Sequence, residues 1–507
     1  MLHRIPTWAL ALAVLAAAQS LLLAQGRQPG RRPAAQPNVN SRHEEFKTQA
    51  DQAYQRGEYD QTLQLTERVL RENARDHVAL YLRGSARIEL GFSRGQAQSL
   101  RDGIADVREA IRFAGTASPN PNYYLPYLAG MTRLSVVEGR RDHAETAVQV
   151  ADQVLGAPRP NAPLRLTAEH RANLLYQRGN AQLFLENFER AIADFQATLE
   201  QERQHLGALV GLAEANASAG RTEPALEAYT RAVRAFPDNP LVYNNRGMYL
   251  QRLGRHDEAI DDFTRALQLN SSYVFAYTNR GFTLLESGNP QAAEADFTQS
   301  LRVDPNQPTV YSLRGTARVA QGKLRDALAD QRKVVELDPN SAMARADLGF
   351  TLFFMGDHSQ ALAALERAVA LDPQMRYLDP WRFLTLEHLG RTDDARNLFA
   401  ESLNKASAAR DWNDQLLSFQ AGAQNADDLL KAANVADSAA RNAQLCEAHF
   451  FIGQQHALAG DEQAAADHFR QSVDTGARHL SAYRGAEYAL KRFTAAEGPR
   501  VAPLPLR

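Results

Sequence analysis

The chain is short of cysteine and has no excess of charge of either sign. Its 507 residues contain one cysteine, Cys446, so the chain cannot form an internal disulfide. The formal net charge is −2, which argues against nucleic acid or an anionic membrane surface as a general partner. The fold must therefore be stabilised by packing alone.

Common catalytic and nucleotide-binding motifs are also missing. The sequence has no GxxxxGK[ST], GxGxxG or HExxH pattern. One GxSxG match, centred on Ser93, lies in a region of helical pattern, whereas a nucleophile elbow needs a strand before the serine. We therefore expect no enzyme activity, no catalytic residue and no cofactor.

A 34-residue spacing organises the middle of the chain. Such a period indicates stacked repeat units, each of which buries its apolar face against its neighbours. Three series of small residues follow it: Gly247, Gly281, Gly315 and Gly349; Gly220, Gly254, Gly288, Gly322, Gly356 and Gly390; and Ala191, Ala225, Ala259, Ala293, Ala327, Ala361 and Ala395.

Each unit has the pattern of two amphipathic helices joined by a turn. In residues 240–273, Tyr243 and Gly247 share one face of a first helix, and Ala259 and Phe263 share one face of a second. A glycine stands between the two helices, where a left-handed backbone commonly ends a helix. The unit is therefore predicted to be a helical hairpin.

These residues resemble the tetratricopeptide repeat (TPR), as in YNNRGMYLQRLGRHDEAIDDFTR from residue 243. The resemblance implies an all-α, right-handed superhelical solenoid of about eleven hairpins, some of them degenerate. Seven regular units are expected over 172–409, starting at residues 172, 206, 240, 274, 308, 342 and 376.

The remaining repeats are expected to be less regular. Residues 43–158 read as degenerate TPR-like units, with an insertion at 92–102, and a second insertion at 156–168 precedes the regular array. Residues 410–445 have an irregular helical pattern, and 446–495 read as a terminal repeat with a capping helix. Whether the insertions carry a function stays open.

The two ends differ from the repeats. Residues 1–24 combine Arg4 with the apolar run Thr7–Ala18, as expected for a signal peptide or an N-terminal anchor. Residues 25–42 read as a disordered Pro/Arg/Gln-rich linker, and 496–507 as a disordered tail. The chain is thus expected to be exported, in the periplasm or outside the cell, or anchored to the inner membrane by residues 7–24.

The TPR resemblance implies a concave groove lined by the first helices, which in this family holds a peptide or partner protein. Asn245 and Asn279 are candidates for an asparagine ladder that bonds to peptide backbone. An aromatic cluster, for which core packing is an equal alternative, completes the candidate ligand-binding set: Phe282, Phe350, Phe353 and Phe354. The repeated arginines Arg246, Arg280 and Arg314 are interpreted as packing residues and not as an anion site.

Cys446, His449 and His456 fall on one face of one predicted helix and offer the best candidate metal ligands. The two histidines also occupy the packing positions of a repeat, and packing is the favoured interpretation, with no metal expected. A metal-binding or enzymatic role through this helix is kept as an alternative function.

We therefore predict a non-catalytic scaffold or adaptor of the cell envelope that binds a peptide or protein. The C-terminal part resembles NlpI-like envelope TPR adaptors, although the lipid-attachment cysteine is absent. The other alternative is a component of an envelope polysaccharide-assembly or secretion complex. Partner identity, cleavage of the first segment, oligomeric state and the choice between protein and glycan stay open.

Overall fold

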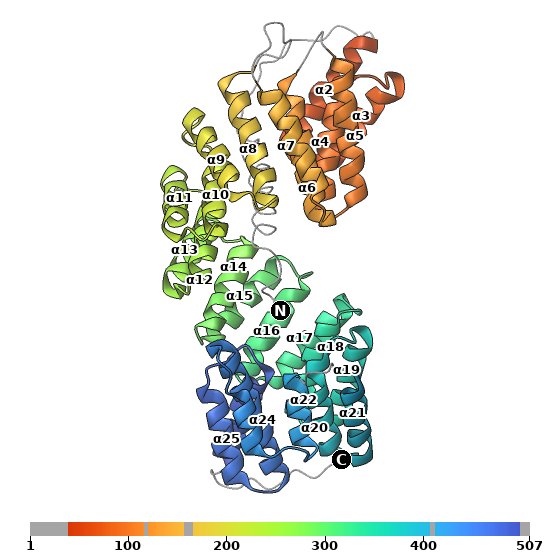
Figure 1. The fold of residues 1–507 in the computed structure, drawn as a ribbon. Helices are drawn as coiled ribbons and strands as arrows, with labels where there is room; N and C mark the ends of the chain where they lie inside the picture. The colour runs from red at the N-terminus through yellow and green to blue at the C-terminus, as the bar shows by residue number, and fades with distance from the viewer. Residues whose placement is uncertain (1–38, 116–119, 157–165, 406–410, 497–507) are drawn as a thin grey trace. The chain divides into compact units, whose positions relative to one another are not determined.

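The computed structural model describes residues 39–115, 120–156, 166–405 and 411–496, and within these ranges the chain forms 25 α-helices and no strand (Figure 1). The helices follow one another as hairpins, and within each unit most helices pack on the next one along the chain. The predicted all-α TPR solenoid is confirmed. The chain divides into two compact units, residues 1–246 and 247–507.

The described part of the first unit begins with three hairpins and continues with the first units of the regular array. Its helices are α2 (Val39–Gln55), α3 (Tyr59–Glu72), α4 (His77–Ser93), α5 (Ala97–Ala114), α6 (Tyr124–Glu138), α7 (Asp142–Leu155), α8 (Ala168–Phe184), α9 (Phe188–Gln201), α10 (Leu206–Ser218) and α11 (Thr222–Ala235). A 3-10 turn, η2 (Pro121–Tyr123), precedes α6, and α12 (Pro240–Arg252) spans the boundary between the units.

The second unit continues the array and ends in a less regular group of helices. Its hairpins are α13 (His256–Leu269), α14 (Val274–Glu286), α15 (Pro290–Val303), α16 (Pro308–Ala320), α17 (Leu324–Leu337), α18 (Ala342–Phe354), α19 (His358–Leu371), α20 (Asp379–His388) and α21 (Thr392–Lys405). The turn η3 (Arg376–Leu378) precedes α20, and the last helices are α22 (Trp412–Gln420), α23 (Ala426–Ala433), α24 (Ser438–Leu458), α25 (Glu462–Asp474) and α26 (Ser481–Ala496).

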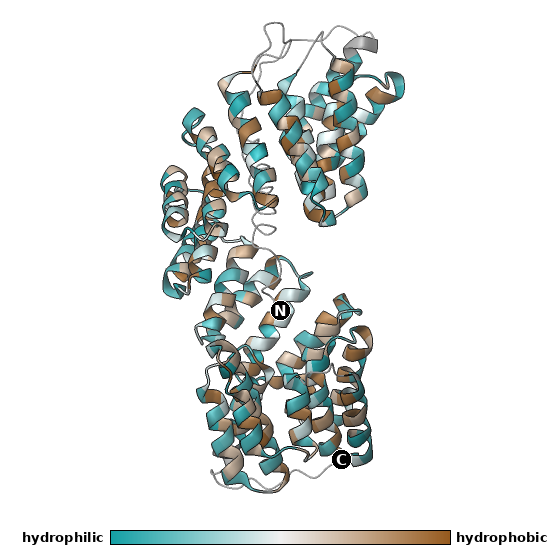
Figure 2. Cartoon of the chain, in the orientation of Figure 1, coloured by the Kyte–Doolittle hydropathy of each residue, from teal (hydrophilic) through white to brown (hydrophobic). Residues whose placement is uncertain are grey.

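The hairpin turns and the small residues have the roles that their spacing predicts. Gly254 has a φ of +73° in the turn after α12, where a residue with a side chain would be strained. Ala259 and Phe263 are 0 % exposed between the packed helices. Figure 2 shows hydrophobic and hydrophilic residues interleaved along the hairpins, as amphipathic helices require.

The predicted insertion at residues 92–102 is wrong. Helix α4 continues to Ser93, a short turn follows at Gly95 (φ +64°), and α5 begins at Ala97. The two helices have 17 and 18 residues, whereas α12 and α13 have 13 and 14. The extra residues therefore add about one turn to each helix, and Gly91 is buried inside α4 instead of ending it.

Several observed helix starts coincide with, or lie near, the other predicted boundaries. Helices α10, α12, α14, α16 and α18 begin at the five unit starts predicted from 206 to 342. Helix α2 begins at Val39, within the predicted linker, and α24 begins at Ser438, eight residues before the predicted start of the terminal repeat. The predicted signal segment, most of the linker, the core of the second insertion and the tail lie outside the described residues.

Across the described residues, no helix combines the length and the apolar character needed to cross a bilayer.

Candidate interaction surface

The predicted aromatic groove residues of α18 lie in a core. Phe350, Phe353 and Phe354 are 6 %, 5 % and 6 % exposed, so at these positions the structure shows core packing, the alternative kept in the sequence analysis, and not an exposed groove patch. The ring centroid of Phe350 lies 4.8 Å from that of Trp381 on α20, which in turn lies 4.9 Å from that of Phe450 on α24. Helices from further along the chain thus cover the face of α18 that would otherwise be open.

The other predicted groove residues are also largely covered. Asn245 is 6 % exposed and accepts a 3.5 Å hydrogen bond from the side chain of Asn244. Asn279 is half-buried, and Phe282 is half-buried against the core around Phe297. Ligand binding by these three predicted residues stays a prediction.

A different set of side chains is exposed at one repeat position. Phe275, the second residue of α14, is 61 % exposed, and Met343, the second residue of α18, is 42 % exposed. Thr309 is exposed at the same place on α16, and the hydroxyl of Tyr377 contacts the sulfur of Met343 at 3.7 Å. The four residues are successive members of a 34-residue series, and α14, α16 and α18 pack side by side.

We name Phe275, Thr309, Met343 and Tyr377 the position-two stripe. Its first three members are the second residues of α14, α16 and α18, and its fourth, the half-buried Tyr377, is the second residue of the turn η3 that precedes α20. These residues form a further 34-residue series in the sequence, but unlike the aromatic residues of α18 they are not clustered there.

The repeated arginines are paired with carboxylates. Arg280 donates two hydrogen bonds of 2.7 Å to Asp296, and Arg314 donates bonds of 3.0 and 2.6 Å to Asp330. Both carboxylates are on the second helix of the same hairpin and are buried. The interpretation of these two arginines as structural residues is thus supported, although they act through ion pairs as well as through their alkyl chains.

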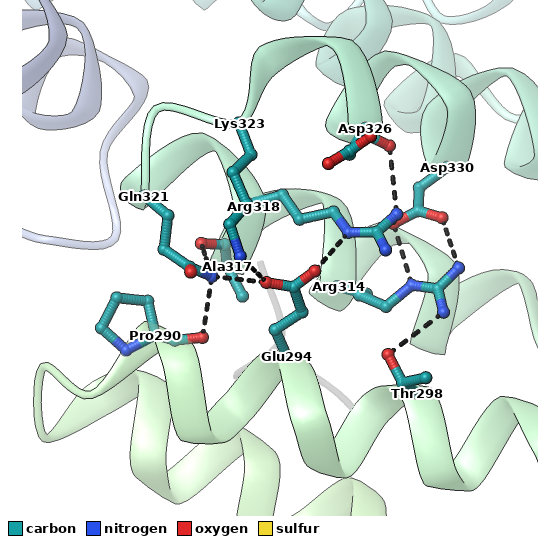
Figure 3. Close-up of polar contacts among 10 residues, drawn as sticks. All are labelled: Pro290, Glu294, Thr298, Arg314, Ala317, Arg318, Gln321, Lys323, Asp326 and Asp330. Atoms are coloured by element: carbon teal, nitrogen blue, oxygen red, sulfur yellow. Dashed lines mark hydrogen bonds and ion pairs between the residues drawn. The ribbon is translucent and has the colours of Figure 1, made fainter.

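A second polar network joins α15 to the next hairpin (Figure 3). Glu294 on α15 accepts hydrogen bonds from Arg318 (2.8 Å), Gln321 (2.9 Å) and Lys323 (2.7 Å). Partial burial opposes ionisation, but the bonds from Lys323, Arg318 and Gln321 lower the pKa of Glu294 to about 2. Arg318 also donates to Asp330, at 2.8 Å, so its charge is neutralised from both sides.

The candidate metal ligands do not converge. Cys446 is buried, its sulfur lies 3.4 Å from the hydroxyl oxygen of Ser472, and burial raises the pKa of its thiol to about 11. His449 instead faces His468 on α25, with 3.0 Å between their Nδ1 atoms. Burial and the neighbouring His468 lower the pKa of His449 to about 4. Among the described residues no group of three or more His, Cys, Asp or Glu side chains is placed to hold a metal ion.

Ser93 has no catalytic surroundings. Its hydroxyl donates a 3.0 Å hydrogen bond to the carbonyl of Leu90 within α4, and a helix precedes it where a nucleophile elbow needs a strand. The serine hydroxyl therefore binds a backbone carbonyl in the last turn of α4.

Comparison with known families identifies tetratricopeptide repeats within residues 176–379, and proteins built from this repeat are generally non-catalytic scaffolds for protein–protein interaction. Three family models, each described as tetratricopeptide repeat, match the chain. The first matches residues 176–240 and again residues 278–342, the second matches residues 240–273, and the third matches residues 318–379. A search of curated proteins finds no match.

Solved structures with a similar fold include YrrB, described as a TPR protein with an unusual peptide-binding site (22% identity, 36% of this chain and 93% of that one, TM-score 0.32). Another is pilF of Pseudomonas aeruginosa (22% identity, 41% of this chain and 94% of that one, TM-score 0.36). A third is a tetratricopeptide repeat protein of Parabacteroides merdae (20% identity, 52% of this chain and 99% of that one, TM-score 0.36).

Proposed function

We propose that this chain is a non-catalytic scaffold of the cell envelope that binds a partner protein along the position-two stripe of its second unit. The observation that carries the proposal is the exposure of Phe275 and Met343 at one repeat position, with Tyr377 in contact with Met343. Large apolar side chains gathered on a surface mark interaction sites more often than isolated ones do.

The chemistry of the stripe suits a protein ligand. An aromatic ring offers a large rigid contact area, a thioether adapts to irregular apolar surfaces, and the tyrosine adds a polar group. A partner that presents apolar side chains at the spacing of the hairpins would bury this stripe. The proposed location in the envelope is supported by the sequence of residues 1–24 alone.

The test is affinity capture from the envelope fraction of the source organism with the full chain as bait. The variant bait carries Phe275→Ala, Met343→Ala and Tyr377→Ala together. The control bait carries Val303→Ala, because Val303 is 46 % exposed at the end of a second helix and outside the stripe. All three baits should first show the same helical circular dichroism. Their melting temperatures should agree within a few degrees, which corresponds to about 1 kcal/mol in the free energy of unfolding.

A protein retained by the wild-type and control baits but lost from the variant bait would support the proposal and name the partner. The same list from all three baits would contradict the stripe as the binding site. A ligand that is retained after proteolysis of the extract would be a glycan, and the polysaccharide-assembly alternative would then replace the protein scaffold.

A further inference from the structure

The last described helix packs against helices that precede it by more than 120 residues in the sequence. Helix α26 contacts α24 and α25, as a capping helix would, but it also contacts the first helices α16 and α18. The Nζ atom of Lys491 on α26 donates a 2.9 Å hydrogen bond to the carbonyl of Ala320 on α16. The chain therefore covers part of its own first-helix surface.

Two cationic side chains, Arg478 just before α26 and Lys491 on α26, lie near the ends of the successive first helices α14 and α16. Ala320 is the last residue of α16, where carbonyl groups lack partners within the helix and carry partial negative charge. Gly288 lies just beyond the end of α14, with a φ of +84°, and a side chain built on it would collide with the guanidinium of Arg478. Arg478 thus lies beside the turn after α14, and Lys491 binds the C-terminal end of α16 in the next hairpin.

A third cation faces a carboxylate. Asp347 on α18 accepts a 3.1 Å hydrogen bond from the hydroxyl of Ser312 on α16. Burial raises the pKa of Asp347, and the positive charge of Arg484 on α26 opposes this rise. Burial likewise lowers the pKa of Arg484, and the charge of Asp347 opposes that change. Docking of α26 therefore places the positive charge of Arg484 near the carboxyl group of Asp347.

Close packing completes the contact. A Cβ atom built on Gly485 would lie 2.8 Å from a ring carbon of Phe354 and 2.7 Å from one of Phe450, so the helix needs a glycine there. One turn further on, the ring of Tyr488 lies 6.4 Å from that of Phe354, between centroids. The face of α26 that meets α16 and α18 thus carries Arg484, Gly485, Tyr488 and Lys491.

We propose that Asp347, the ends of α14 and α16 and the ring of Phe354 form a docking site for a basic amphipathic helix, that α26 is its intramolecular occupant, and that a partner helix with the same pattern exchanges with it. We name these groups the α26 site. The ends of α14 and α16 lie at the opposite ends of these helices from Phe275 and Thr309. Asp347, however, lies one turn after Met343 and interacts electrostatically with Tyr377, so Phe275 is the stripe residue that can be tested separately from the α26 site.

Exchange is favoured by the place of α26 at the end of the array. Each element of a solenoid contacts mainly its neighbours, and a terminal helix can leave without unfolding the hairpins before it. A partner helix binds with an apparent affinity reduced by the fraction of molecules in which α26 still occupies the site. Weakening the resident helix should therefore tighten binding of an added one.

The experiment uses a fluorescent peptide with the sequence of residues 477–496 and the full-length protein. In fluorescence anisotropy we expect the variant Tyr488→Ala with Lys491→Glu to bind this peptide at least about tenfold more tightly than the wild type. Adding Asp347→Asn to that variant should weaken binding at least about fivefold. A peptide with its arginine and lysine residues changed to glutamate serves as the control ligand and should not bind.

Hydrogen exchange read by mass spectrometry supplies the second measurement. We expect α26 to exchange faster than α25 in the wild type, and faster still in the Tyr488→Ala, Lys491→Glu variant. If α26 exchanges no faster than α25 in the wild type, or if the peptide fails to bind a variant whose α26 has become unprotected, the proposal is overturned. The single variant Phe275→Ala changes the stripe at the opposite end of α14 from Gly288 and should bind the peptide as the wild type does, so failure of one surface is distinguishable from failure of the other.

Discussion

The ring of Phe297 on α15 occupies the space that a side chain at Gly281 on α14 would need. A Cβ atom built on Gly281 would lie 2.8 Å from a ring carbon of Phe297, and Gly247 has the same relation to Phe263. The next hairpin differs, because Gln331 stands where the phenylalanine would be. A Cβ on Gly315 would there come no closer than 3.6 Å to any neighbouring atom.

This difference predicts opposite outcomes for one substitution at equivalent sites. Gly281→Ala should destabilise the second unit by about 1–3 kcal/mol, because the added methyl group overpacks the contact with Phe297. Gly315→Ala should be neutral or should stabilise by up to about 1 kcal/mol, because alanine favours a helix more than glycine does and the space exists. Urea unfolding followed by circular dichroism measures both, and equal losses would contradict the packing argument.

The sequence predicted the hairpins well because their packing is local. A 34-residue series of glycines and alanines requires two helices that approach closely, and most unit starts were therefore placed within a few residues. The insertion at 92–102 was wrong for a related reason. Extra residues equal to one turn in each helix preserve both packing faces, and the sequence pattern of a longer hairpin resembles that of an interrupted one.

The candidate site was predicted less well because its burial depends on contacts between distant segments. Periodicity places Phe350 on the open face of a first helix, but no local pattern reveals that Trp381 and Phe450 cover it. Conversely, Phe275 and Met343 are isolated in the sequence and form a stripe only when the hairpins stack. Where α26 docks also depends on contacts between distant segments, such as the bond between Lys491 and Ala320, which are 171 positions apart, and no single repeat encodes these contacts.

Asp330 should be more important for stability than either of its arginine partners. It is 3 % exposed and accepts hydrogen bonds from Arg314 and Arg318, so Asp330→Ala would leave two guanidinium groups without this partner. Breaking a buried ion pair in this way costs about 3–5 kcal/mol. Arg314→Ala should cost less, because Arg318 would still neutralise the carboxylate.

Chemical denaturation of the two variants, beside Asp326→Ala as an exposed control on the same helix, gives the comparison. A loss for Arg314→Ala as large as that for Asp330→Ala would show that Arg318 does not substitute for Arg314.

Cys446 should be unreactive in the folded protein. Its thiol is buried, and burial raises its pKa to about 11, so the thiolate that reacts with alkylating agents is scarce at neutral pH. Iodoacetamide should therefore modify the native protein slowly and the urea-unfolded protein quickly, as intact mass measures. Rapid labelling of the native chain would revive the catalytic alternative for this helix.

Trp412 and Glu447 should make the C-terminal helices sensitive to pH. The indole nitrogen of Trp412 on α22 donates a 2.7 Å hydrogen bond to the carboxyl group of Glu447 on α24. Burial raises the pKa of Glu447 to about 7, and this hydrogen bond offsets only part of the rise. The folded chain therefore keeps a proton on Glu447 that the unfolded chain, with a pKa near 4.5, loses earlier.

Because the folded state binds more protons between these two pKa values, the contribution of Glu447 to stability falls as the pH rises from about 4.5 to about 7. Glu447→Gln stays neutral, and its amide oxygen can accept the same bond from Trp412. The variant should match the wild type at low pH and exceed it by about 1–3 kcal/mol above neutrality. Thermal unfolding across this range measures the difference, and Glu462→Gln on α25, at an exposed position, is the control. A constant difference between Glu447→Gln and the wild type at every pH would mean that Glu447 does not titrate in this window.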